Sequence, residues 1–240
     1  MRITAIIPAR YSSSRLPGKP IKDICGKTMV RRVYEQVEKV SLIDEIIVAT
    51  DDQRIYDEIK NFDGNVIMTT KDHKTGTDRL AEVAAKIDSD IIVNVQGDEP
   101  LINPLVIKSA IEPLLLDASL KISTLKHLIK DKKDINNPNI VKVITDGNNN
   151  AIYFSRSKIP FSRNSQKFNY YKHIGLYVYR RNFLLKFAEM SSTPLEVQES
   201  LEQLRVIENG YKIKVIETEY DSIGVDTEED LNKVRNILGE

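Results

Sequence analysis

Residues 3–20 read ITAIIPARYSSSRLPGKP, an apolar run followed by a loop of small residues and cations. The apolar run stops at Pro8, which predicts a buried strand. The loop after it carries Arg10, Arg15 and Lys19. Its small residues allow backbone amides to approach a ligand, and its cations suit a polyphosphate. A solvated basic loop explains the same residues equally well, so composition leaves both interpretations open.

Apolar runs and helical patterns alternate through the first half of the chain. Strands are predicted at 3–7, 45–50, 66–69 and 91–95, and helices at 28–40, 51–61 and 77–87. Strands separated by segments of helix length indicate βαβ units and a mainly parallel sheet. The uninterrupted runs EIIVAT and IIVNV are typical of strands buried on both faces.

The second half has a less regular pattern, and some of its strands are expected to be antiparallel. Strands are predicted at 122–125, 141–144, 151–154, 174–179 and 212–217, and helices at 195–209 and 228–238. Within the first of these helices Glu196, Glu199 and Glu202 share one side, which is typical of a solvated face. No linker interrupts the chain, so one α/β domain is predicted over residues 1–240.

The overall composition excludes several classes of protein. The 240 residues are 41% hydrophobic and include 35 basic and 35 acidic side chains. This balance argues against intrinsic disorder and against a dedicated nucleic-acid binder. Cys25 is the single cysteine, so a reducing compartment is the simpler expectation. No apolar run has the length of a signal-peptide core or a membrane span, which predicts a soluble, cytoplasmic protein.

Two acidic residues are candidate metal ligands. Asp98 follows the predicted strand at 91–95, and a carboxylate there is a hard oxygen ligand suited to Mg²⁺. A simple turn is the alternative, because Gly-Asp and Pro favour one. Asp226 precedes the last predicted helix, where it or Thr227 would also serve as an ordinary helix cap.

Other kinds of site lack their signatures. His73, His127 and His173 have no metal-ligand spacing, and no H-E-x-x-H occurs. The chain contains neither a Walker loop nor G-x-G-x-x-G, which argues against an NAD-dependent dehydrogenase. Cys25 has no neighbouring pattern that marks a nucleophile.

Seven blocks, in order from Ile6 to Leu231, together resemble one family. They are IIPARYSSSRLPGKP, DHKTGTDRL, NVQGDEP, YFSRSKIPF, KHIGLYVYR, PLEVQESLEQLR and GVDTEEDL. The chain resembles the 3-deoxy-manno-octulosonate cytidylyltransferases, or CMP-Kdo synthetases. The resemblance implies an enzyme that joins CTP and the acidic sugar Kdo into CMP-Kdo and pyrophosphate for lipopolysaccharide biosynthesis. It also implies a Rossmann-like fold of the nucleotide-diphospho-sugar transferase type, with a mixed, mainly parallel sheet flanked by helices, a homodimer, and Mg²⁺ as cofactor.

The same resemblance implies roles for individual residues. CTP binding is implied for Pro8, Ala9, Arg10, Ser13, Arg15, Lys19, Thr77, Arg79, Gln96 and Asp98. Sugar binding is implied for Gln96, Arg156, His173, Tyr177, Glu202 and Gln203. The implied metal ligands are Asp98 and Asp226, and the implied catalytic residues are Lys19, Arg15, Asp98 and Asp226.

The mechanism that we expect relies on charge and on the metal. Arg15 and Lys19 would neutralise the leaving phosphates, and Arg156 is the candidate partner for the sugar carboxylate, because a guanidinium binds a carboxylate bidentately. No general base is evident, which favours metal activation of the attacking hydroxyl. Two alternatives are the same chemistry on 8-amino-3,8-dideoxy-Kdo or another ulosonic acid, and an inactive nucleotide-binding protein that acts by interaction.

Overall fold

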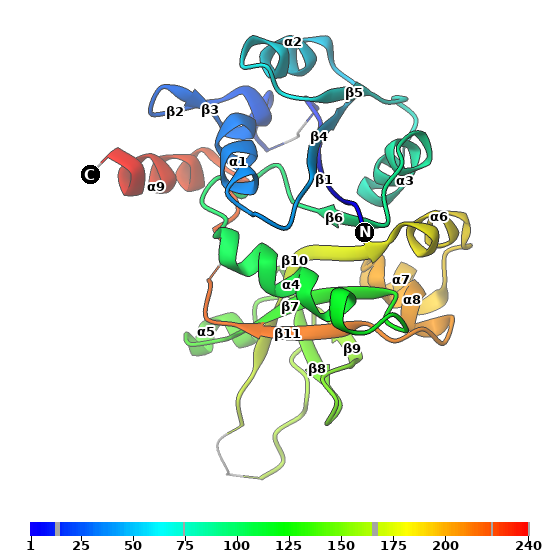
Figure 1. Ribbon diagram of the computed structural model, residues 1–240. Helices are drawn as coiled ribbons and strands as arrows, with labels where there is room; N and C mark the ends of the chain where they lie inside the picture. The colour runs from blue at the N-terminus through cyan, green and yellow to red at the C-terminus, as the bar shows by residue number, and fades with distance from the viewer. Residues whose placement is uncertain (13–14, 74, 165–167, 222, 240) are drawn as a thin grey trace. The chain divides into compact units, whose positions relative to one another are not determined.

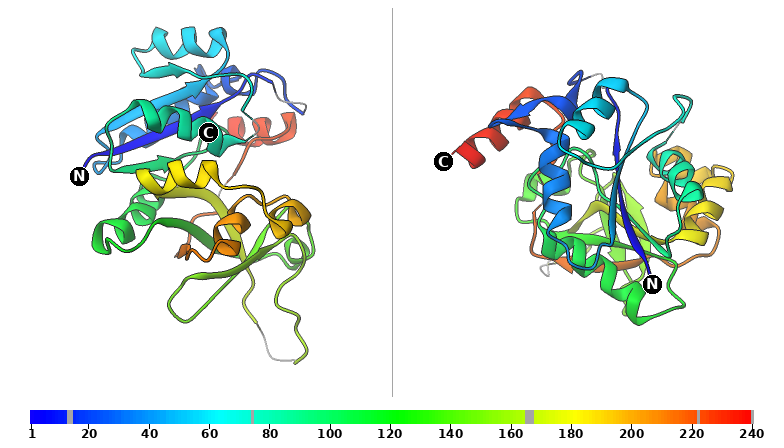
Figure 2. Two further views of the ribbon diagram at one scale, coloured as in Figure 1. Left: turned by 90° about the vertical axis from the view of Figure 1, so that its right-hand side faces the viewer. Right: turned by 45° about the horizontal axis from the view of Figure 1, so that its top comes forward.

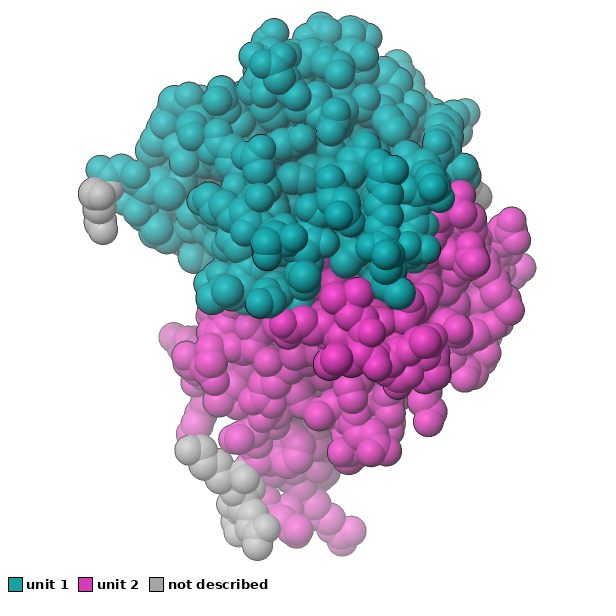
Figure 3. Space-filling model, viewed as in Figure 1, with its two compact units in different colours: residues 1–108, 222–240 teal, residues 109–221 magenta. Residues whose placement is uncertain are grey.

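The computed structural model describes residues 1–12, 15–73, 75–164, 168–221 and 223–239. The chain divides into two compact units (Figure 3). Unit 1 comprises Met1–Lys108 and Ser222–Glu240, and unit 2 comprises Ser109–Asp221. The two units are described one at a time.

A parallel sheet forms the centre of unit 1. Its strands lie in the order β6 (Ile91–Asn94), β1 (Ile3–Ala9), β4 (Glu45–Thr50) and β5 (Val66–Met68). The middle of β1 has no exposed surface, because helices cover both faces of the sheet. Burial on both faces explains why these strands read as continuous apolar runs in the sequence.

Helices connect the strands of unit 1, namely α1 (Met29–Glu38), α2 (Gln53–Asn61) and α3 (Gly76–Lys86). Helix α9 (Glu228–Gly239) belongs to the same unit and follows near the C-terminus. The chain passes outward from β1 through α1 to β4, and through α2 to β5, before α3 returns it to β6 on the other side of β1. In Figures 1 and 2, α1 and α3 cover opposite faces of the sheet. The direction of winding therefore reverses between β1 and β6, and such a switch point is where open α/β sheets bind ligands.

A small satellite core joins the N-terminal loop to the C-terminal segment. Short elements follow β1, namely the 3₁₀ helix η1 (Lys19–Ile21) and the hairpin strands β2 (Asp23–Ile24) and β3 (Lys27–Thr28). Buried side chains from both ends of the chain pack together here: Leu16, Ile24, Met29, Val225, Leu231 and Val234. This packing fixes residues 15–19 and residue 226, which are far apart in sequence, within one local structure.

Unit 2 contains a mixed sheet. Strand β7 (Ile122–Leu128) is antiparallel to β10 (Tyr171–Arg180) and parallel to β11 (Lys214–Thr218). Strand β8 (Lys142–Thr145) is antiparallel both to β10 and to β9 (Ala151–Ser155). The prediction that the second half contains antiparallel strands is therefore confirmed.

Among the described residues, five helices accompany this sheet or lead into it. They are α4 (Pro104–Leu116), which begins in unit 1, then α5 (Lys132–Ile135), α6 (Arg181–Glu189), α7 (Pro194–Glu199) and α8 (Gln203–Glu208). Within the described ranges, no helix combines the length and apolar character needed to cross a membrane. The α/β class with a mixed, mainly parallel sheet is confirmed, whereas the single domain over 1–240 stays a prediction.

One predicted helix is wrong. Residues 195–209 form two helices, because Ser200 adopts a left-handed conformation with φ 52° and ends α7. The expected solvated face also differs, since Glu196 is buried and pairs with Arg205. The predicted end at Gly210 is confirmed, with φ 78° just after the last helical turn.

Candidate active site

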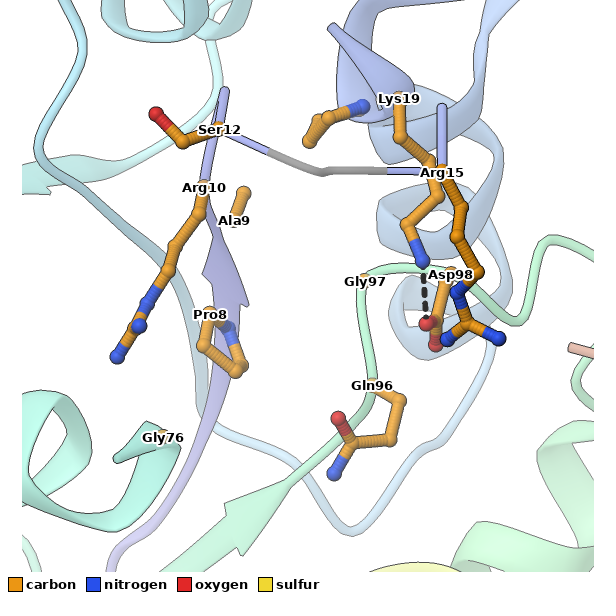
Figure 4. A pocket seen from close by; sticks show the side chains of 11 residues that line it. Pro8, Ala9, Arg10, Ser12, Arg15, Lys19, Gly76, Gln96, Gly97 and Asp98 are labelled. Atoms are coloured by element: carbon orange, nitrogen blue, oxygen red, sulfur yellow. Dashed lines mark hydrogen bonds and ion pairs between the residues drawn. The ribbon is translucent and has the colours of Figure 1, made fainter. Parts of the chain in front are cut away.

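A pocket opens in unit 1 where β1 and β6 end. Its volume is about 380 Å³. Figure 4 shows Arg10 and Gly76 on one side and Arg15, Lys19 and Asp98 on the other. The residues that line the pocket are Pro8, Ala9, Arg10, Ser12, Arg15, Lys19, Pro20, Gly76, Gln96, Gly97 and Asp98. The two sequence blocks predicted to bind a ligand therefore meet at one place.

Gly97 allows the two strand ends to approach each other. A Cβ atom at this position would lie 2.7 Å from the backbone oxygen of Pro8, closer than such atoms can pack. Backbone atoms cannot move aside as a flexible side chain can. In the sequence Gly97 is typical of a turn, and its close contact with β1 becomes evident only in the fold.

We expect Gly97→Ala to destabilise the protein and weaken nucleotide binding. Overpacking of this kind costs about 1–3 kcal/mol, because the ends of β1 and β6 must separate. Gly147→Ala is a matched control, since a Cβ there has nothing within 4 Å. Urea denaturation and CTP titration of both variants measure the effect, and equal stabilities would contradict the argument.

Two cations and two carboxylates meet at the end of the pocket formed by residues 15–19. The ammonium of Lys19 lies 2.8 Å from Asp98 Oδ2 and 3.1 Å from Asp226 Oδ1. The guanidinium of Arg15 lies 3.0 Å from Asp226 Oδ2. Burial alone would lower the pKa of Lys19, but the charge of Asp98 and hydrogen bonds to both aspartates raise it above its ordinary value. Lys19 is therefore held as a cation.

Local backbone contacts bring Asp226 to this cluster. The amide of Val225 donates to the backbone oxygen of Asp98 at 2.9 Å, and the Val225 side chain is buried in the satellite core. Thr227 accepts the amide of Asp230 in the manner of a helix cap. Of the two capping candidates in the sequence, Thr227 serves this role, and the Asp226 carboxylate faces Lys19 and Arg15.

On the opposite side, Arg10 supports the loop that precedes α3. Its guanidinium donates to the backbone oxygens of His73 at 3.2 Å and Thr75 at 2.9 Å. Thr75 also forms a reciprocal capping box with Asp78, which sets the start of α3 beside the pocket. Gly76, the first residue of α3, follows directly and is part of the pocket wall.

Glu82, on α3, fixes the other end of this loop. Its carboxylate accepts the amide of Thr70 at 2.9 Å, the His73 ring nitrogen Nε2 at 2.5 Å, and the Lys86 ammonium at 2.7 Å. Burial opposes ionisation, but these hydrogen bonds outweigh it and lower the pKa of Glu82 to about 2. Glu82 is not among the residues predicted from the sequence, since its partners are brought together only in the folded protein.

We expect Glu82 to contribute to acid sensitivity. A carboxyl whose pKa falls on folding stabilises the protein above its unfolded value and loses that contribution as pH falls. For Glu82 the loss extends from about pH 4.5 down to about pH 2. Urea denaturation across this interval should show a smaller decline for Glu82→Gln than for wild type. Exposed Glu219→Gln is the control, and a wild-type decline in Glu82→Gln would refute the expectation.

The structure brings most of the predicted CTP-binding residues to the pocket. The lining includes Pro8, Ala9, Arg10, Arg15, Lys19, Gln96 and Asp98. Thr77 and Arg79 are buried and are not part of this lining, so their contact with nucleotide stays a prediction. Ser13 lies outside the described residues. Ser12, Pro20, Gly76 and Gly97 line the pocket but were not predicted as site residues.

Arg79 instead supports the end of β4. Its side chain is fully buried, with one nitrogen 2.9 Å from Asp51 Oδ2 and another bonded to the hydroxyl of Thr69. Asp51 directly follows β4, and Thr69 directly follows β5. Arg79 therefore joins α3 to the residues that follow two strand ends.

Of the predicted sugar-binding residues, Gln96 lies in unit 1 and the other five lie in unit 2. His173 and Tyr177 are neighbours on β10, with ring centroids 5.3 Å apart, and His173 Nε2 lies 2.9 Å from Thr124 Oγ1. Burial lowers the pKa of His173 to about 3 and raises the pKa of Tyr177 well above its ordinary value. Both rings are therefore neutral near pH 7. Glu202 and Gln203 lie at the start of α8.

Arg156 is held firmly in unit 2. Its guanidinium donates to the backbone oxygens of Glu199, Pro138 and Ser200. The Glu199 carboxylate accepts the Arg156 amide at 2.9 Å and the Ser155 hydroxyl at 2.6 Å. Glu199 therefore orients Arg156. This corrects the prediction that Glu199 lies on a solvated face. A guanidinium has five N–H donors, more than these three contacts use.

The residues present fit a magnesium ion. Asp98 and Asp226 supply hard carboxylate oxygens, and both lie within 3.1 Å of one ammonium group. Within the described part of the chain, no group of three or more His, Cys, Asp or Glu side chains could hold a metal. Since Mg²⁺ needs about six oxygens, the others would come from water and phosphate.

The fold and the pocket together define a class of protein. A doubly wound sheet with cations and two carboxylates at its switch point suits a nucleoside triphosphate with its metal. The chain is a nucleotidyltransferase, and a model of the cytidylyltransferase family matches its residues 4–213. The chain belongs to this family, in the branch whose curated members are named 3-deoxy-manno-octulosonate cytidylyltransferase.

Several relatives are similar over nearly the whole chain. The protein of that name from Geobacter metallireducens is 57% identical, over 98% of this chain and 96% of the relative. The one from Geotalea uraniireducens is 59% identical, over 98% of both chains. A solved structure of CMP:2-keto-3-deoxy-manno-octonic acid synthetase complexed with CTP is 43% identical. Its TM-score is 0.96, and the match covers 100% of this chain and 99% of that one. The predicted family and enzyme class are confirmed.

Proposed function

We propose that the protein transfers the CMP group from CTP to the anomeric hydroxyl of Kdo, giving CMP-Kdo and pyrophosphate. The observation that carries this proposal is the TM-score of 0.96 with a CMP-Kdo synthetase bound to CTP. The pocket at the ends of β1 and β6 supports it, because cations and Asp98 line that pocket, and Asp226 contacts two of those cations.

The transfer is an in-line displacement at phosphorus. A bond forms between the sugar oxygen and the α-phosphorus, the bond from that phosphorus to the β-phosphate oxygen breaks, and pyrophosphate leaves. Arg15 and Lys19 neutralise negative charge that grows on the leaving phosphates. Arg10 holds the backbone of His73 and of Thr75 just before α3, which helps to position Gly76 in the pocket wall.

Asp98 and Asp226 would hold Mg²⁺, which when bound would lower the pKa of the sugar hydroxyl. Both side chains lie at the pocket end where the phosphates are proposed to bind, beside Lys19 and Arg15. Arg156 would bind the sugar carboxylate, helped by the rigid hold of its guanidinium on three backbone oxygens.

We also propose a cytoplasmic homodimer that serves lipopolysaccharide biosynthesis. The exposed thiol of Cys25 suits a reducing compartment. Several large apolar side chains of unit 2 are exposed, among them Phe161 at 86%, and they suit burial against a second copy of the chain.

A pyrophosphate-release assay tests the proposed reaction. We expect release with CTP and Kdo in the presence of Mg²⁺, and little release with UTP, ATP or GTP. Parallel reactions with 8-amino-3,8-dideoxy-Kdo distinguish the sugars. Turnover of the amino sugar without turnover of Kdo would replace the proposed substrate, and no release with any sugar would overturn the proposed activity.

A further inference from the structure

The cluster of Arg15, Lys19, Asp98 and Asp226 already contains its own counter-ions. Lys19 Nζ lies within 3.1 Å of one oxygen from each aspartate, and Arg15 lies 3.0 Å from the second oxygen of Asp226. The Lys19 side chain is only 15% exposed, compared with 65% for Arg15. Lys19 is therefore the inner cation, located between the two carboxylates, and Arg15 is the outer one.

A divalent metal on these carboxylates would compete with Lys19. Metal ligation requires the aspartate oxygens to approach the ion to about 2.0–2.1 Å. The same oxygens now accept hydrogen bonds from the Lys19 ammonium, namely Asp98 Oδ2 and Asp226 Oδ1. Two cations held by one pair of carboxylates repel each other strongly, because the cluster is partly shielded from water.

The protein also supplies few oxygens for such a metal. In the residues that the structure covers, no third acidic, histidine or cysteine side chain completes a site. The triphosphate could provide what is missing in two ways. Its oxygens are further metal ligands, and its negative charge offers Lys19 a new partner within the same pocket.

We infer that Lys19 acts as a lock on the metal site. In the nucleotide-free enzyme it neutralises Asp98 and Asp226 and blocks metal binding. When CTP binds, Lys19 moves to the phosphates, and the two carboxylates become available to the metal. This inference rests on the proposed metal role of the two aspartates. It makes metal and nucleotide binding cooperative, because each favours the state in which Lys19 has left the carboxylates. The charge of the cluster is also balanced before CTP arrives.

Binding of Mn²⁺ to the full-length, nucleotide-free protein tests the lock without turnover. Free Mn²⁺ is measured by electron paramagnetic resonance in wild type, Lys19→Met and Arg15→Met. We expect Lys19→Met to bind Mn²⁺ about tenfold more tightly than wild type, within the usual range of coupling between sites. Arg15→Met should gain less, because Arg15 contacts only Asp226 and is largely exposed.

Two further variants make the result specific. Lys19→Gln is a second neutral replacement, used together with circular dichroism in case Lys19→Met does not fold. Lys19→Met combined with Asp98→Asn should lose the gain in Mn²⁺ affinity. Equal Mn²⁺ affinity in wild type and both Lys19 variants would overturn the lock. A gain that persists without the Asp98 carboxylate would overturn it as well, by locating the metal elsewhere. Failure of the proposed transfer reaction is a separate result, read from pyrophosphate release by wild type.

Discussion

Asp98→Asn and Asp226→Asn should each lower the rate of CMP transfer by at least about 100-fold. Loss of a residue that only hydrogen-bonds to a metal ligand typically lowers metal affinity or activity about 10–100-fold. Asp98 and Asp226 are the proposed ligands themselves, so a larger loss is expected. Asparagine keeps the size of the side chain but removes the negative charge that would attract Mg²⁺. The measurement is the steady-state rate of pyrophosphate release at saturating CTP and Kdo.

The fold should survive both substitutions. Asp98 and Asp226 remain 32% and 45% exposed, so neither side chain belongs to the core. Asp88→Asn, at an exposed position of unit 1, controls for a change of charge away from the pocket. Unchanged unfolding midpoints would show that the lost rate reflects chemistry. Rates like those of wild type in both variants would refute the metal assignment.

Arg79→Met should lower the free energy of unfolding by about 3 kcal/mol. Removing one partner of a buried ion pair typically costs about 3–5 kcal/mol, because the other charge stays behind unpaired. The lower end applies here, since Asp51 remains 19% exposed and water can reach it. The hydroxyl of Thr69 also loses the donor that Arg79 provides, although it still donates to the backbone oxygen of Thr50. Urea denaturation at pH 7 measures the loss.

The same substitution at an exposed pair is the control. Arg54 pairs with Asp52 but is 57% exposed, so water screens the pair and Arg54→Met should lower the stability far less than Arg79→Met does. Equal losses of stability in the two variants would show that the burial of Arg79 does not determine the cost of removing it. If Arg79→Met kept full stability but lost CTP affinity, Arg79 would contact the nucleotide after all.

Local sequence patterns predicted the core of unit 1 well. The strand expected at 45–50 is β4 with the same bounds, because every residue after Glu45 is buried. Such a strand needs no tertiary context to be recognised, since both of its faces must be apolar. The helices expected at 28–40 and 77–87 are also present as α1 and α3, each shorter or shifted by one or two residues at its ends.

Prediction failed where a tertiary contact overrides local preference. Residues 195–209 have a helical pattern, yet the chain turns at Ser200, and Glu196 of α7 pairs with Arg205 of α8 within unit 2. That pair is buried, and the turn brings its two members together. Helix α4 was not expected at all, although it carries an apolar face with Ile107, Ile111 and Leu114 buried.

The sequence by itself determined the family, the parallel strands of unit 1 and the kinds of charge that its loops carry. These depend on residue types and short spacings. Only the tertiary structure decided that Lys19 lies between Asp98 and Asp226, which are 79 and 207 positions away in the chain. It also decided that Arg79 supports the strand ends from a buried position and does not line the pocket. The physical reason is that ion pairing and burial depend on distances in space, and the folded sheet and the satellite core set these distances.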